Sequence, residues 1–134
     1  MEITMKQILI LFILLLALNN CGGDYNKNLP NNYKLARTSS SEVSIYEPGG
    51  KGIIAPNIDR YAVIGDIVVG YVEKPQPPAD LEGSNPVLGY FILNTKTHEL
   101  LQGYGKEKWL EKLRLYGINE EPKLHRSTYF DRNY

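Results

Sequence analysis

The chain has 134 residues, and its 15 basic and 15 acidic side chains give a formal net charge of zero at pH 7. A neutral chain lacks the concentrated basic face that nucleic-acid binding requires, so no nucleic-acid partner is expected. A single cysteine cannot form an intramolecular disulfide, so packing must stabilise the fold. The ten tyrosines, against three phenylalanines and one tryptophan, suit half-buried strands and wet binding faces.

The first feature along the chain is an uninterrupted apolar run, ILILFILLLAL, at residues 8–18. A membrane-spanning helix needs ~20 apolar residues, whereas the hydrophobic region of a secretory signal peptide needs only ~7–15. The run also lacks the polar face of a helix that packs on a core. A start at Met5 instead of Met1 would place Lys6 near the N-terminus, as is usual for signal peptides, and both starts stay open. The sequence therefore predicts that residues 1–20 are a signal peptide that is removed.

The lone cysteine, Cys21, follows this run. With Leu18 three residues before Cys21, the segment resembles a bacterial lipobox, and Asn20 stands where that motif prefers Gly, Ala or Ser. The resemblance implies lipidation of Cys21, and two or three acyl chains make a stable membrane anchor. Gly22 instead of aspartate resembles an outer-membrane sorting signal. We therefore expect a lipid-anchored protein of the bacterial envelope that faces outside the cytoplasm, on the periplasmic side of the outer membrane in a Gram-negative host.

The polar, Asn-rich residues 21–32 are expected to be the lipidated cysteine and a flexible tether. From Tyr33 onward, short β-branched or aromatic segments between turn residues predict strands. Gly65-Asp66 predicts a type II′ hairpin turn, and the sequence NTKT at 94–97 predicts a second hairpin loop. The predicted strands cover 33–37, 43–46, 61–64, 67–73, 88–94 and 99–102.

Residues 105–118 give the one clear helical pattern. Trp109, Leu110, Leu113 and Tyr116 share one stripe that can pack on a sheet, and Gly117 stands where a helix ends. We therefore predict an α+β domain over 33–122. It contains a mainly antiparallel sheet of about five to seven short strands, with one C-terminal amphipathic helix packed on it.

Two further segments could contact a partner. Residues 74–86 hold four of the eight prolines and predict an exposed loop, in which Pro75, Pro77 and Pro78 are candidate contacts. A solvated spacer is the simpler interpretation of this loop. The tail, 123–134, is basic and aromatic and is either a last strand or a mobile end. Its Tyr129 and Tyr134 are also candidate contacts.

No motif in the chain indicates catalysis. His98 and His125 lack the spacing of metal ligands, and the serines at 39–41 lack the context of a nucleophile elbow. The sequence GGKG at 49–52 does not match a phosphate-binding loop. We therefore predict no catalytic, cofactor-binding or metal-binding residue and do not expect an enzyme.

Three segments, NYKLARTSS at 32–40, GYFILNTKT at 89–97 and GYGKEKWLEKLRLYGI at 103–118, resemble a group of small uncharacterised bacterial lipoproteins. The resemblance covers most of residues 5–118 and implies an envelope address and a compact α+β domain, but no activity. We expect a non-catalytic binding module of the immunity, inhibitor or exclusion type, with a protein partner in the envelope. The alternatives are a structural or accessory subunit of an envelope complex and, less favoured, an envelope enzyme.

Overall fold

The structure is a computed structural model that describes residues 4–8, 25–39, 42–74 and 86–127. Within these ranges the chain forms nine strands, a 3-10 helix, the helix α2 and a short helical segment at residues 5–8. The elements are β1 (Tyr25–Asn28), η1 (Pro30–Asn32), β2 (Lys34–Ser39), β3 (Glu42–Tyr46), β4 (Gly52–Ile54), β5 (Ile58–Ile64), β6 (Ile67–Val72), β7 (Gly89–Asn94), β8 (Glu99–Tyr104), α2 (Lys106–Arg114) and β9 (His125–Arg126). Among the described residues, no helix has the length and hydropathy that crossing a membrane requires.

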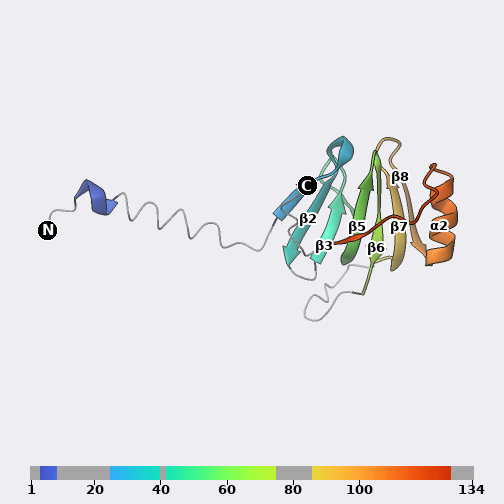
Figure 1. Ribbon diagram of the computed structural model, residues 1–134. Coiled ribbons are helices and arrows are strands. Elements are labelled where there is room, and N and C mark those ends of the chain that lie inside the picture. Colours follow the sequence, from blue (N-terminus) through green and yellow to red (C-terminus); the bar gives the residue numbers. More distant parts are fainter. Residues whose placement is uncertain (1–3, 9–24, 40–41, 75–85, 128–134) are drawn as a thin grey trace.

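The strands form two antiparallel sheets (Figure 1). The first sheet has the order β1-β2-β3-β4, and the second has the order β8-β7-β6-β5-β9. The prediction of a mainly antiparallel, sheet-rich fold is thus confirmed. The described strands are more numerous than predicted and form two sheets instead of one, so the fold is mainly β. The sequence does not predict β1 and β4, which have only four and three residues, whereas the two-residue β9 lies in the tail, for which a last strand is one of the two expected alternatives.

The folded region begins earlier than the sequence predicts. Residues 25–32 are assigned to a tether by their composition, yet Tyr25 to Asn28 pair with β2 from Arg37 to Lys34. Leu29 follows and is only 6% exposed in the core between the sheets. A polar strand such as β1 pairs through its backbone and shows no apolar alternation, so composition alone does not reveal it.

The predicted hairpins are present. β5 and β6 pair from Ile64 opposite Ile67, and Gly65 between them has φ +59°, the sign that a type II′ turn requires there. In the β7–β8 hairpin, the Asn94 side chain accepts hydrogen bonds from the backbone N–H groups of Lys96 and Thr97, at 3.1 and 3.2 Å. Local turn chemistry therefore sets the register of both hairpins.

The second sheet carries buried residues on both faces, and successive side chains of its strands point to opposite sides. Along β6, Val68 and Val72 point into the core shared with the first sheet, whereas Val69 points to the other face. β7 repeats the pattern, with Phe91 and Leu93 on one side and Ile92 on the other. The shared core comprises Leu29, Tyr33, Leu35, Val43, Ile45, Ile54, Ile58, Tyr61, Val68, Val72, Phe91 and Leu93.

Helix α2 packs on the other face of the second sheet, as Figure 1 shows. Trp109 and Leu113 are completely buried there, and the Trp109 indole N–H donates to the Phe91 carbonyl at 3.1 Å. The helix is shorter than the predicted 105–118: it ends at Arg114, and the chain continues as a turn to Gly117, at φ +77°, after which the Ile118 N–H donates to the Leu113 carbonyl in a Schellman arrangement. The chain then runs back across the sheet as an extended segment that ends in β9.

Candidate functional site

A pocket of about 290 Å³ opens on the face of the second sheet that carries α2. Its walls come from four parts of the fold: β5, the paired strands β6 and β7, the first turn of α2, and the C-terminal segment that follows the helix. We call it the tyrosine pocket. Its lining residues are Asp59, Arg60, Tyr71, Tyr90, Lys106, Glu121, Pro122 and Leu124.

Two tyrosines form the aromatic surface of the pocket. Tyr71 and Tyr90 stand directly opposite each other in the β6–β7 pairing, and their ring centroids are 4.8 Å apart at an interplanar angle of 60°. Alternation puts both rings on the α2 side, because they share the face of Val69 and Ile92. Tyr90 also stacks on Trp109, with centroids 4.5 Å apart and planes at 27°. The buried Trp109 therefore packs under one of the two tyrosine rings that line the pocket.

Two ion pairs line the pocket beside these rings. The Arg60 Nε lies 3.2 Å from the Asp59 carboxylate on β5, and the Lys106 ammonium lies 2.6 Å from the Glu121 carboxylate. The second pair joins the start of α2 to the C-terminal segment. Its hydrogen bond and charge raise the pKa of Lys106. The four groups together have no net charge, so the pocket favours neither an anion nor a cation.

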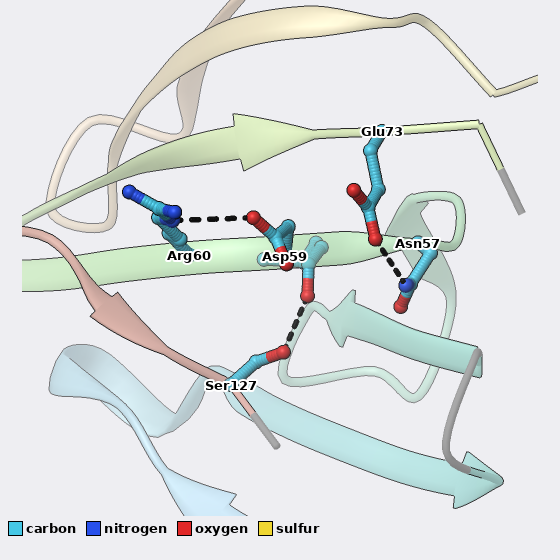
Figure 2. Close-up of polar contacts among 6 residues, drawn as sticks. Asn57, Asp59, Arg60, Glu73 and Ser127 are labelled. Atoms are coloured by element: carbon cyan, nitrogen blue, oxygen red, sulfur yellow. Dashed lines mark hydrogen bonds and ion pairs between the residues drawn. The ribbon is translucent and has the colours of Figure 1, made fainter. Parts of the chain in front are cut away.

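The β5 wall is fixed from two sides (Figure 2). On one side, Ser127 donates through its hydroxyl to the Ile58 carbonyl and through its N–H to the Asp59 carbonyl at 2.9 Å. On the other side, the Asn57 amide donates to the Glu73 carboxylate at 3.3 Å, which links the start of β5 to the end of β6. These bonds hold the backbone that carries Asp59 and Arg60.

A second polar cluster lies at the opposite end of the second sheet. The Asn31 amide donates to the Asp66 carboxylate at 3.1 Å and to the Thr95 hydroxyl at 2.9 Å. Beside it, the Tyr33 hydroxyl and the His98 Nδ1 are 2.6 Å apart. These bonds join η1 to the two hairpin turns, and the members satisfy one another. We assign this cluster to the stability of the fold.

In the part of the chain that the structure describes, the histidines and acidic residues do not converge on a site that could hold a metal ion. His98 is exposed and contacts Tyr33, and His125 lies in β9 opposite Tyr61. Within 4–8, 25–39, 42–74 and 86–127, no three His, Cys, Asp or Glu side chains form a group that could hold a metal ion.

The site residues chosen from the sequence are elsewhere in the chain. Cys21, Pro75, Pro77, Pro78, Tyr129 and Tyr134 all lie outside the described residues. No sequence motif marks any of the pocket residues. The available signal is the tyrosine excess, together with one tyrosine in each of two consecutive predicted strands. The register that places Tyr71 opposite Tyr90 is a property of the folded pair.

Comparisons with known proteins give no relative: no family model, no curated protein and no solved structure matches this chain.

Proposed function

We propose that this chain is a lipid-anchored protein of the bacterial cell envelope that acts as a non-catalytic binding module. The observation that carries the binding role is the tyrosine pocket, in which two aromatic rings are surrounded by four charged side chains. Binding pockets commonly combine aromatic surface with a few convergent polar groups. The pocket has aromatic contact surface on paired strands and hydrogen-bonding groups on β5, α2 and the C-terminal segment, which suits recognition of a ligand.

The membrane anchor in this proposal is Cys21. It follows an apolar run of signal-peptide length, and the first strand begins only four residues later, at Tyr25. Four residues of extended chain span at most about 14 Å. A lipid on Cys21 would therefore hold the domain close to the membrane, and a ligand of the pocket would be a component of the envelope or a molecule that reaches it.

The proposal also includes the finer description of the fold, an α+β domain in which one C-terminal helix covers the sheet. The burial of Trp109 and Leu113 against the second sheet supports it. The helix supports the pocket as well, because Trp109 lies under Tyr90 and Lys106 lines the wall.

The anchor is tested with Cys21→Ser in a bacterial host fed a labelled fatty acid. Wild-type protein should incorporate the label and sediment with membranes, and Cys21→Ser should lose the label. A label that persists in Cys21→Ser would contradict the lipid attachment.

The binding role is tested in cells with the photoreactive amino acid p-benzoylphenylalanine in place of Tyr71. The same amino acid in place of Tyr46, a half-buried tyrosine of the first sheet, is the matched control. We expect a light-dependent adduct from position 71 that is absent from position 46. Adducts of equal yield at both positions would contradict a ligand in the pocket, and adducts with resident envelope proteins from position 46 alone would favour an accessory subunit.

A further inference from the structure

The size of the tyrosine pocket limits its ligand. Sites for drug-sized molecules occupy about 300–1,000 Å³, and this pocket, at about 290 Å³, is just smaller than the lower limit of that range. It suits a single saturated ring or one side chain. The two tyrosine rings, tilted by 60° to each other, form a corner that can contact such a ring on a face and on an edge.

The charges of the pocket limit the chemistry of that ligand. A phosphate, sulfate or carboxylate that approached Arg60 or Lys106 would also approach their partner carboxylates, Asp59 and Glu121. A cation that approached Asp59 or Glu121 would likewise approach the positive charge of Arg60 or Lys106. Each charge is already neutralised within 4 Å, so a charged ligand must break an ion pair or bring a like charge close to it. An uncharged ligand avoids both costs.

The hydrogen-bonding groups of the pocket limit the ligand further. Arg60 and Lys106 are donors, whereas the carboxylates of Asp59 and Glu121 are acceptors. The Asp59 contact uses the Nε of Arg60, and Figure 2 shows the other end of the guanidinium pointing away from Asp59. A ligand that satisfies all four groups must therefore carry both donors and acceptors around a compact ring. Hydroxyl groups supply both.

A pyranose ring meets each of these conditions. One of its faces presents polarised C–H groups that contact the negative face of an aromatic ring, and its hydroxyls form charge-assisted hydrogen bonds with ionised side chains. A proline-rich peptide also packs on tyrosines, but proline has no N–H donor and would leave the carboxylates of Asp59 and Glu121 without partners from the ligand.

From these constraints we infer that the tyrosine pocket binds a neutral pyranose unit of a glycan. The inference rests on the proposed binding function and adds the chemical class of the ligand. Tyr71 and Tyr90 contact the sugar ring, and the two ion pairs orient its hydroxyls. Trp109, the one tryptophan of the chain, lies under Tyr90 and reports on the site through its fluorescence.

The inference is tested with the full chain in a detergent that has no sugar headgroup. Methyl β-D-glucopyranoside and methyl N-acetyl-β-D-glucosaminide are the neutral probes, while glucuronate and protonated glucosamine carry opposite charges. Trp109 fluorescence and ligand-observed saturation-transfer NMR are two independent measurements. A single ring of this size should bind with Kd on the order of 1 mM. At least one neutral probe should saturate, and the charged probes should bind about threefold more weakly or not at all.

The variants locate the site. Tyr71→Ala should weaken binding about three- to tenfold, because it removes one aromatic contact and leaves the Tyr90–Trp109 stack in place. Arg60→Ala should weaken it by a similar factor, and Tyr46→Ala should bind as wild type does. Far-UV circular dichroism checks that each variant is folded.

The inference is overturned if no neutral probe saturates by either measurement, if a charged probe or a proline-rich peptide binds more tightly, or if Tyr71→Ala has no effect. The photocrosslinking test separates this failure from that of the proposed function. An adduct specific to position 71 would leave the binding role standing while the sugar is rejected. The absence of both adduct and sugar binding would reject both.

Discussion

Asn57 is a buried side chain that bonds to both sheets, and its replacement gives the sharpest test of the fold. It is 5% exposed; its Oδ1 accepts from the Val43 N–H of β3 at 3.2 Å, and its Nδ2 donates to the Glu73 carboxylate at 3.3 Å. One amide group thus satisfies the first sheet and the second sheet at once. In Asn57→Leu, the buried Val43 N–H loses its acceptor.

The expected cost follows from the burial of these groups. A buried donor left without a partner costs about 1–3 kcal/mol, and Glu73 is half-buried, so water can replace much of its lost bond. We therefore expect Asn57→Leu to lower the free energy of unfolding by about 2–3 kcal/mol. For a domain of this size, that loss lowers Tm by roughly 10–15 °C. Asn119→Leu, at an exposed asparagine after the helix, should change stability by less than about 0.5 kcal/mol.

Asn57→Asp distinguishes the hydrogen bond to Val43 from the hydrogen bond to Glu73. The introduced carboxyl keeps an acceptor for Val43 but faces the Glu73 carboxylate, so burial and the like charge raise its pKa above the unfolded value of about 3.9. An acid with a raised pKa in the folded state is destabilising when ionised, and its deficit shrinks as the pH falls through that pKa. Asn57→Asp should therefore recover stability between about pH 7 and pH 4, whereas Asn57→Leu should not recover by this route.

Urea unfolding followed by Trp109 fluorescence and by far-UV circular dichroism measures all three variants against wild type across this pH range. An Asn57→Leu protein within 0.5 kcal/mol of wild type would refute the stabilising role of the Asn57 bonds to the two sheets. Parallel pH profiles for Asn57→Asp and Asn57→Leu would refute the placement of Glu73 beside the amide.

Two further predictions concern the core and the helix end. At Gly70, an added Cβ would lie 2.7 Å from the Phe91 ring and 2.4 Å from a backbone carbonyl oxygen. Gly70→Ala should therefore lower the free energy of unfolding by about 1–3 kcal/mol, measured by thermal unfolding. The control Gly49→Ala should be near neutral, because no atom lies within 4 Å of the added Cβ there. Burial, followed by the hydrogen bond to Glu99, raises the pKa of Tyr116 to about 12. Because the unfolded phenol ionises near 10, this contribution to stability is complete below pH 10 and is lost as the pH rises toward 12. NMR titration should show a lower Tyr116 pKa in Glu99→Gln, and an unchanged value would contradict the contact.

The features that the sequence predicts correctly are local ones. Gly65 and Asp66 specify their turn without reference to the rest of the chain, and the apolar stripe from Trp109 to Tyr116 specifies a helix face. By contrast, β1, β4 and β9 exist through pairing with strands already formed, and their two to four residues carry no period of their own. The division into two sheets likewise depends on contacts between distant residues, such as the Asn57 link to Val43.

The pocket was beyond prediction for the same reason. Tyr71 and Tyr90 are nineteen positions apart, and Lys106 and Glu121 come from elements that the sequence does not place on the same face. Tyrosine content indicates a binding face in general terms, but only the register of β6 against β7 brings the two rings together. A one-residue slip in that register would move Tyr71 away from Tyr90.

The position of the pocket follows from the widths of the elements that cover the sheet. A helix is about 10 Å wide and covers about two strands at ~4.8 Å spacing, whereas the second sheet has five described strands. Trp109 and Leu113 of α2 cover the Val69 and Ile92 region, and the extended segment through Pro122 and Leu124 covers part of the remainder. An extended chain is narrower than a helix, so the two covering elements do not close over the sheet completely. The pocket lies between them, with Lys106 and Glu121 bonded across its edge. Tyr90 and Leu124 pack against the Trp109 cluster, whereas Tyr71 is half-buried and Arg60 is 50% exposed, so Tyr71 and Arg60 can be replaced with little effect on the core. The ligand can therefore be tested by substitution without unfolding the protein.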